Sequence, residues 1–296
     1  MDEHEWLAER FEENRSHLRA VAYRMLGSPT DADDAVQESW LRLSRSDASS
    51  IENIGGWLTT VVSRVCLDML RSRTARREEP LDAHVPEPAV SPISSAKHID
   101  PEREALLADS VGLAMLVVLD RLTPAERLAF VLHDTFAVSF EEIASILGRS
   151  PTAVRQLASR ARRRVRGAAT ASANVAQQRE VVDAFLAAMR SGDFKALVAV
   201  LDPDVVVRID ETAARAGGPM EIRGAENWAK GAIAFARHIQ FVGPALVNGN
   251  AGLIWAPHGQ LLRALTFRIV EGKIVQAEVI ADPARLRQLD LAVLNG

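Results

Sequence analysis

Features that crosslink or anchor exported proteins are scarce in this sequence. The chain has a single cysteine, Cys66, so no disulfide can form within it, and this excludes a disulfide-stapled scaffold. Cys66 lies in the apolar run from Val61 to Leu70, and we expect it to be an ordinary buried residue. The longest apolar stretch, Val111 to Leu119, is far shorter than the ~20 residues of a membrane span. The first residues, Met1 to Glu13, are acidic and unlike a signal peptide, so we expect a cytoplasmic protein with no membrane partner.

Metal-binding patterns are absent as well. The seven histidines show no metal-ligand spacing, and we expect no metal and no cofactor. Hydrophobic residues make up 48% and charged residues 25% of 296 residues, which is typical of a globular protein with two or three domains. The net charge of −4 has the wrong sign for a DNA-binding protein. The basic residues are clustered, however, so their distribution matters more than the total.

Hydrophobic periodicity and composition divide the chain into four parts. Residues 1–77 and 102–167 have the periodicity of helices, and residues 78–101 hold five prolines among serines and charges, which is typical of an extended linker. Residues 175–296 combine helical segments with β-rich runs. We therefore predict a multidomain protein, with two all-α helical domains followed by an α+β domain.

Capping patterns predict where several helices begin. A Ser or Thr with an acidic residue three positions later can satisfy two free N–H groups at a helix start. The pairs that fit are Thr30 with Asp33, Thr123 with Glu126, and Ser139 with Glu142. The third helix of the first domain is expected from about Trp57 to Arg73.

In the C-terminal part, strand and turn signals alternate. We predict helices at 175–190, 194–201 and 225–237, and strands at 205–209, 239–242, 251–255, 261–270 and 273–280. Turns at Asn248-Gly249 and Glu271-Gly272 are expected to form hairpins.

The segment from Ser139 to Arg166 has the pattern of a helix-turn-helix. A first apolar stripe precedes the tight turn Gly148-Arg149-Ser150, and a second follows it. The inward residues are Phe140, Ile143, Ala144 and Leu147, then Val154, Leu157, Ala158, Ala161 and Val165. The outer face of the second helix is rich in arginine and carries no acid.

This basic face predicts contact with DNA. Side chains in the first turns of such a helix reach base edges, whereas arginines near its end neutralise phosphates. The base-reading candidates are Thr152, Arg155, Gln156 and Ser159, and the further DNA-binding candidates on this helix are Arg160, Arg162 and Arg163. An ordinary solvated basic helix is the alternative that spacing alone does not exclude.

Three segments resemble the extracytoplasmic-function sigma factors of bacterial RNA polymerase. They are AYRMLGSPTDADDAVQESWLRL, GWLTTVVSRVCLDMLRSRTARR and LTPAERLAFVLHDTFAVSFEEIASILGRSPTAVRQLASRARRRVR, in the order and spacing of that family. The resemblance covers residues 8 to 166. It implies binding to core RNA polymerase and to promoter DNA, with the helix-turn-helix on the minus-thirty-five element.

The resemblance also implies roles for the first domain. The acidic helix from Asp31 to Leu43 would bind the clamp helices of the polymerase, and the helix that follows would melt the minus-ten element. The polymerase-binding candidates are Asp33, Asp34, Gln37, Glu38 and Trp40. The minus-ten candidates are Arg64, Arg71 and Arg73, with Arg76 and Arg77 also available and Asn53 in the loop before the helix. Without the resemblance, Trp40 would be interpreted as a core residue and the acids as helix-capping groups.

Residues 175–296 resemble a SnoaL-like domain, a cone-shaped α+β fold carried by one subgroup of these sigma factors. Pro86-Glu87-Pro88 resembles a linker signature of that subgroup, and Asp282-Pro283-Ala284-Arg285-Leu286 resembles its C-terminal motif. A glycine-rich motif is reduced to Ala216-Gly217-Gly218-Pro219. The resemblance implies regulation in cis, with Pro86, Glu87, Pro88, Asp282, Pro283 and Leu286 as contact residues.

Two other functions stay open at this point. One is a helix-turn-helix regulator that senses a small-molecule ligand through its C-terminal domain, and the other is a cyclase-like or isomerase-like enzyme. The polar residues that such a cone would offer are Asp210, His238, Trp255, His258, Arg263 and Asp282. Their spacing favours no catalytic arrangement, and we expect no enzymatic activity.

Overall fold

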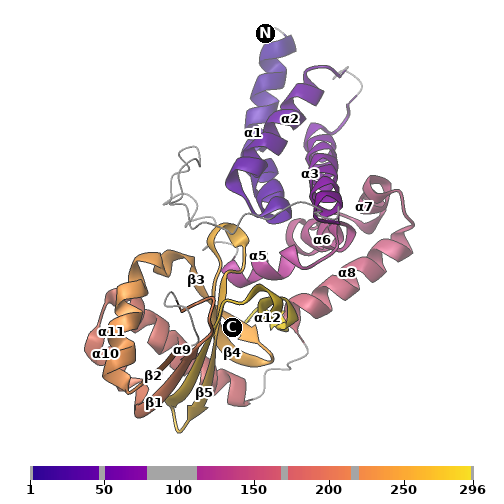
Figure 1. The fold of residues 1–296 in the computed structure, drawn as a ribbon. Coiled ribbons are helices and arrows are strands. Elements are labelled where there is room, and N and C mark those ends of the chain that lie inside the picture. The colour runs from indigo at the N-terminus through magenta and orange to yellow at the C-terminus, as the bar shows by residue number, and fades with distance from the viewer. Residues whose placement is uncertain (1–2, 47–50, 79–111, 168–172, 215–219, 295–296) are drawn as a thin grey trace. The chain divides into compact units, whose positions relative to one another are not determined.

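The computed structural model describes residues 3–46, 51–78, 112–167, 173–214 and 220–294 (Figure 1). Their contacts define two compact units, residues 1–106 with 122–161 and residues 107–121 with 162–296. Almost all of the predicted linker, residues 79–101, lies outside the described residues. Two helical parts and an α+β part are present, which confirms the predicted fold class.

Three long helices begin the first unit: α1 (Glu3–Leu26), α2 (Pro29–Leu43) and α3 (Ile54–Glu78). Helix α1 packs against both others. Cys66 is fully buried among their apolar side chains, as predicted, and burial raises the pKa of its thiol to about 12 even though Arg127 and Arg73 oppose the shift. The core also holds Leu18, Met25, Leu43 and Leu58.

Two helix starts differ from the sequence prediction. The cap of α2 is Ser28 and not Thr30, because the Ser28 Oγ accepts the Asp31 N–H and Pro29, which lacks an N–H, occupies the first turn. Helix α3 begins at Ile54, three residues before Trp57. There the Asn53 Oδ1 accepts the Gly56 N–H at 3.0 Å.

The helix-turn-helix is formed by α7 (Phe140–Leu147) and α8 (Pro151–Arg166), after α6 (Pro124–Phe130) and a π-helical segment (Val131–Thr135). The expected capping boxes at Thr123 and Ser139 are both present. Gly148 ends α7 with φ +63°, a conformation that favours glycine. The predicted inward residues Val154, Leu157, Ala158 and Ala161 are buried, which confirms the orientation of α8.

The second unit is built on a seven-stranded sheet of order β2-β1-β6-β5-β4-β3-β7. Among the described strands, β1 and β6 are the one pair that is parallel. The strands are β1 (Leu201–Ile209), β2 (Met220–Arg223), β3 (Val242–Val247), β4 (Asn250–Trp255), β5 (Arg263–Val270), β6 (Lys273–Ile280) and β7 (Leu291–Ala292). Asn248-Gly249 and Glu271-Gly272 turn with positive φ between paired strands, so both predicted hairpins are confirmed.

Helices α9 (Ala173–Ser191), α10 (Phe194–Ala199) and α11 (Ala225–Phe235) pack on one face of this sheet (Figure 1). At the centre of the core between them, Phe185 stacks on Trp228, and Phe267 contacts both rings at tilted angles. Short α12 (Pro283–Gln288) follows β6. Helix α5 (Leu113–Asp120) packs against β3 and β7 of the same unit.

Sequence patterns missed the shortest and least regular of these elements. The strand expected at 239–242 is mostly a 3-10 helix (Ala236–Phe241), and β3 extends instead from Val242 to Val247. Its Gly243-Pro244 pair resembles a turn, and the strand is stabilised by pairing with β4 and β7. The sequence prediction also omits β2, β7 and α12, although Asp282 followed by Pro283 is a helix-start pattern for α12.

Candidate polymerase and DNA interfaces

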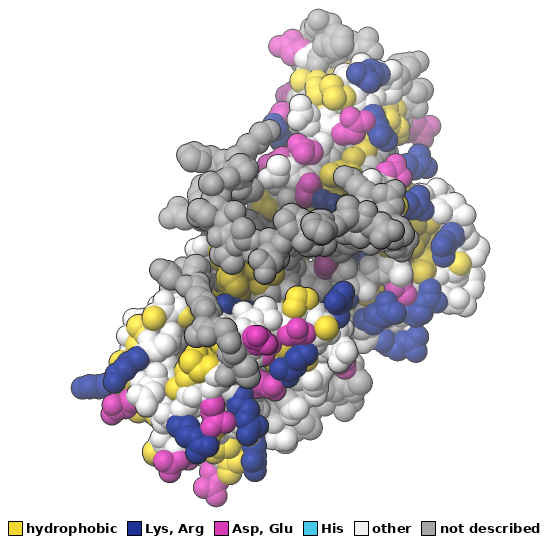
Figure 2. Space-filling view, in the orientation of Figure 1, with side chains coloured by type: hydrophobic (Ala, Val, Ile, Leu, Met, Phe, Trp, Pro, Cys, Tyr) yellow, Lys and Arg dark blue, Asp and Glu magenta, His cyan; other side chains and the backbone are white. Residues whose placement is uncertain are grey.

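Helix α8 presents a basic outer face. Thr152, Arg155, Gln156, Ser159, Arg160 and Arg163 are exposed, and Arg162 is half-buried. Figure 2 shows Lys and Arg side chains gathered along this helix. The described residues of α8 include no acid to offset that charge. A helix of this kind is suited to the negative surface of a DNA groove.

Arg155 is held in place by an aromatic stack. Its guanidinium carbon lies 4.9 Å from the centre of the Phe140 ring, and Phe140 stacks on His133 with ring centres 3.8 Å apart. The His133 Nδ1 is itself 3.0 Å from the Val138 carbonyl oxygen. Packing of this kind restricts a long side chain before it meets its target, so less entropy is lost on binding.

Arg160 bonds to a buried acid. Its Nε donates to the Glu126 Oε1 at 3.0 Å, and the Glu126 side chain is only 5% exposed. The second oxygen of Glu126 accepts the Thr123 N–H and hydroxyl at the start of α6. Arg160 therefore connects α8 to the cap of α6, a role that the sequence pattern did not reveal.

On α2, the polymerase-binding candidates are not equivalent. Asp34 and Gln37 are exposed, whereas Asp33 pairs with Arg19 at 2.6 Å and Glu38 with Arg42 at 2.9 Å. Trp40 is half-buried, and its ring centre lies 5.1 Å from that of Phe11.

Leu41 joins this face of α2 and was missed from the sequence. It is 38% exposed, unusually high for a large apolar residue of this chain. Leu41 follows Gln37 by four residues and Asp34 by seven, so the three side chains lie on one face of the helix. This spacing is the sequence signal that could have identified Leu41 as part of the face. The exposed face of α2 thus combines an acid, an amide and an apolar side chain.

The candidates on α3 also divide into two kinds. Arg64 and Arg71 are exposed, and Arg71 lies 3.8 Å from Asp68. Arg73 instead bonds within the protein, with its Nη2 2.5 Å from Asp31 and its Nη1 donating to the Leu26 carbonyl at 3.2 Å. The side chains of Arg76 and Arg77 lie outside the described residues.

Of the regulatory candidates, only those in the C-terminal motif are described; Pro86, Glu87 and Pro88 are not. Asp282 caps α12 by accepting the Arg285 N–H at 2.8 Å, Pro283 is the first helical residue, and Leu286 is buried. The carbonyls of Leu286 and Leu289 both accept hydrogen bonds from Arg121, the residue that follows α5.

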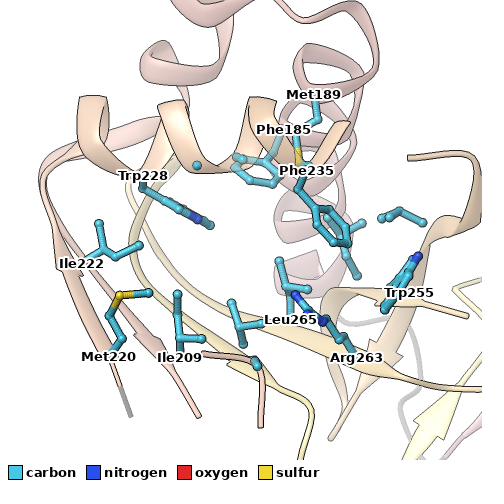
Figure 3. Close-up of a pocket in the computed structure, with 16 residues that line it drawn as sticks. Phe185, Met189, Ile209, Met220, Ile222, Trp228, Phe235, Trp255, Arg263 and Leu265 are labelled. Carbon is cyan, nitrogen blue, oxygen red and sulfur yellow. The ribbon is translucent and has the colours of Figure 1, made fainter. Parts of the chain in front are cut away.

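A cavity of about 250 Å³ lies between α9, α11 and the sheet (Figure 3). Trp255 and Arg263, two of the six polar residues considered above, line it. Asp210 and Asp282 do not, and the side chains of His238 and His258 lie outside the described residues. Among the described residues, no group of three or more potential metal ligands occurs. Nor is any helix in the described segments long and apolar enough to cross a membrane.

Two helical parts, the second with a helix-turn-helix and a basic outer face, are typical of DNA-binding transcription proteins. Residues 10–76 match the model of sigma-70 region 2, and residues 113–165 match that of sigma-70 region 4. The chain is 39% identical over 290 residues to the ECF RNA polymerase sigma factor SigJ of Mycobacterium tuberculosis, covering 92% of this chain and 91% of SigJ. The chain belongs to the extracytoplasmic-function (ECF) sigma factors.

A second relative is similar to this chain over nearly its whole length. The probable ECF RNA polymerase sigma factor SigI of M. tuberculosis is 36% identical, with 98% of each chain covered, so this similarity includes the C-terminal domain. The crystal structure of M. tuberculosis SigJ covers 95% of this chain and 98% of that one, with 34% identity and a TM-score of 0.44. The protein is thus a sigma factor that directs transcription initiation, and it is not an enzyme. Sigma factors act by binding core RNA polymerase and promoter DNA.

Proposed function

We propose that α8 reads the minus-thirty-five element of the promoter, with Arg155 as its main base contact. The Phe140 stack supports this choice, because it holds a guanidinium fork ready in the second turn of the helix. Thr152, Gln156 and Ser159 are also exposed in the N-terminal part of α8 and would contact neighbouring bases. Arg162 and Arg163, nearer the end of α8, would contact phosphates.

Helix α2 would bind the polymerase through its exposed face of Asp34, Gln37 and Leu41, together with the half-buried Glu38 that pairs with Arg42. A basic partner surface would be attracted by the acids and would cover Leu41.

Arg64 and Arg71 of α3 would contact the backbone of the opened minus-ten element. Their exposure supports this role, whereas the internal bonds of Arg73 favour a structural one.

The C-terminal domain would regulate the sigma regions in cis, by holding the first helix of region 4. Helix α5 lies within the matched span 113–165, yet it packs on β3 and β7. Arg121 donates to the carbonyls of both Leu286 and Leu289, and the Val293 N–H donates to the Val165 carbonyl at 2.9 Å. Both ends of region 4 are therefore bonded to the C-terminal domain, and this arrangement supports a restraining role.

Arg121→Ala in the full chain tests this proposal. It removes the side-chain bonds to Leu286 and Leu289, so we expect run-off transcription with core polymerase to rise severalfold as α5 is released. Arg287→Ala is the matched control, because the side-chain bond of Arg287 is to Pro283 in its own helix. Equal output from the two variants would refute regulation through α5 and leave sigma activity itself intact.

A further inference from the structure

The cavity of the C-terminal domain is lined almost wholly by apolar side chains. Among the described residues that line it, nitrogen or oxygen atoms occur in the side chains of Trp228, Trp255 and Arg263 alone. A buried water molecule needs roughly two to four polar partners to be held firmly. Water in this space is therefore bound weakly, and an apolar guest can displace it.

The size of the cavity sets the size of a guest. Protein interiors hold few voids larger than a water molecule, whereas this cavity has a volume of about 250 Å³. An engineered apolar cavity of ~150 Å³ in another protein binds benzene, so this one has room for a ring with a short substituent. Two of its lining residues are exposed, Met220 at 43% and Gly231, which indicates that the cavity is open to solvent.

Two pairs of aromatic rings line the cavity (Figure 3). Phe185 of α9 stacks on Trp228 of α11, with ring centres 5.0 Å apart and planes 28° from parallel. Phe235 meets Trp255 nearly edge to face, with centres 5.5 Å apart and planes at 79°. Aromatic rings that pack in such geometries interact more favourably than their buried area alone provides. A wall of this kind favours an aromatic guest.

The charges at the cavity favour a neutral guest. Arg263 is the one charged residue among the described lining residues, and it is already engaged, with its guanidinium carbon 5.4 Å from the Phe235 ring centre and 5.3 Å from that of Trp255. No acid lines the cavity in the described part of the chain, so a cationic guest would meet no opposite charge. An anionic guest would lose its hydration among apolar side chains. A neutral guest avoids both costs and requires no bond from Arg263.

We propose that this cavity binds a small, neutral aromatic molecule, held by contact with the rings and aliphatic side chains. The described lining residues include no histidine, carboxylate, hydroxyl, amine or thiol that could act as a base or nucleophile, so the site binds its guest without converting it. The effect of a guest on transcription rests on the regulatory role proposed above, whereas binding does not.

Titration calorimetry of the full chain with acetophenone and benzoate tests the choice of a neutral guest. The two compounds have the same number of non-hydrogen atoms and nearly the same planar shape, so the charge is the main difference. We expect acetophenone to bind at least about tenfold more tightly, because benzoate must lose the hydration of its carboxylate. Its heat capacity of binding should be negative, as burial of apolar surface requires. Equal affinity for the two compounds, or a preference for benzoate, would overturn the proposal.

Gly231→Phe tests whether the guest occupies this cavity. Gly231 lines it from α11, and a Cβ there would meet no atom within 4 Å, so a larger side chain can enter the space without a clash. This variant should abolish acetophenone binding. Ala234→Phe is the matched control, because it adds a ring to the same helix at an exposed position that does not line the cavity, and it should retain binding.

The outcomes separate this site from the regulatory role. Acetophenone binding that survives in Gly231→Phe, or that is absent from the unaltered chain, would refute the proposal. Because the titration contains no polymerase, a chain that binds acetophenone but fails the Arg121→Ala test would keep this site and lose only its regulatory role.

Discussion

Arg155 is the residue on which promoter specificity is expected to depend most. Arg155→Ala should weaken use of the minus-thirty-five element by about 1–3 kcal/mol, the value of one bidentate base contact. Run-off transcription from a preferred promoter and from one with a substituted element measures this difference. Phe140→Leu is the companion variant. It should cause a smaller loss in the same direction, because it removes only the ring that supports Arg155.

A different result would reassign Arg155. If transcription fell equally on every promoter sequence, Arg155 would be a phosphate contact, since backbone contacts carry no sequence information. The base-reading role would then pass to Thr152, Gln156 or Ser159.

Asp210 is expected to stabilise the C-terminal domain in a pH-dependent way. Burial alone would raise the pKa of Asp210, but the N–H groups of Asp282, Ala281 and Ala213, together with Arg285, hold it below the ordinary value. A carboxylate with a lowered pKa stabilises the fold above its unfolded-state pKa, and this contribution is lost as the pH falls through the folded-state pKa.

Asp210→Asn should therefore lower the free energy of unfolding at neutral pH by about 1–3 kcal/mol, the cost of losing charge-assisted hydrogen bonds to a half-buried carboxylate. It should also flatten the decline in stability on acidification. Urea denaturation at a series of pH values measures both effects. A variant whose acid dependence matched that of the unaltered chain would contradict this role for Asp210.

At the scale of elements, α8 combines a structural and a DNA-binding role. Arg160 bonds to the buried Glu126, whereas Arg163 is exposed. Arg160→Ala should lower the free energy of unfolding by about 1–2 kcal/mol, because Glu126 loses a hydrogen bond from a charged group. Arg163→Ala should leave stability unchanged.

The same pair separates DNA binding from folding. Arg163→Ala should reduce the salt dependence of DNA binding by about one counterion, as expected for one lost phosphate contact. Denaturation curves and DNA-binding titrations at several salt concentrations make the comparison. If Arg163→Ala destabilised the fold and Arg160→Ala did not, the two roles would be reversed.

In the C-terminal domain, β3 connects two features. Val242 lines the cavity, and the next residue, Gly243, lies against α5, where an added Cβ would be 3.3 Å from the Leu113 Cβ. Successive residues of a strand face opposite sides of a sheet. Strand β3 thus lies between the cavity and α5.

At the scale of the whole molecule, local sequence signals predicted the architecture well. The capping boxes at Thr123 and Ser139, the turn at Gly148 and both glycine hairpins formed where they were expected. Each depends on residues a few positions apart, so the pattern and the interaction it encodes lie in one short segment. Element ends were less accurate, as the Ser28 cap of α2 and the early start of α3 demonstrate.

The sequence by itself determined the longer helices, the helix-turn-helix, the α+β character of the C-terminal third and the family, because periodicity, capping and ordered motifs are local signals. Only the tertiary structure decided which charged side chains are already engaged. Arg160 meets Glu126 from 34 positions away, and Arg121 meets the Leu289 carbonyl from 168 positions away. Such contacts depend on how distant segments pack, and no spacing along the chain encodes them. The same holds for the cavity, whose described lining residues come from α9, α11 and the sheet and are brought together only by folding.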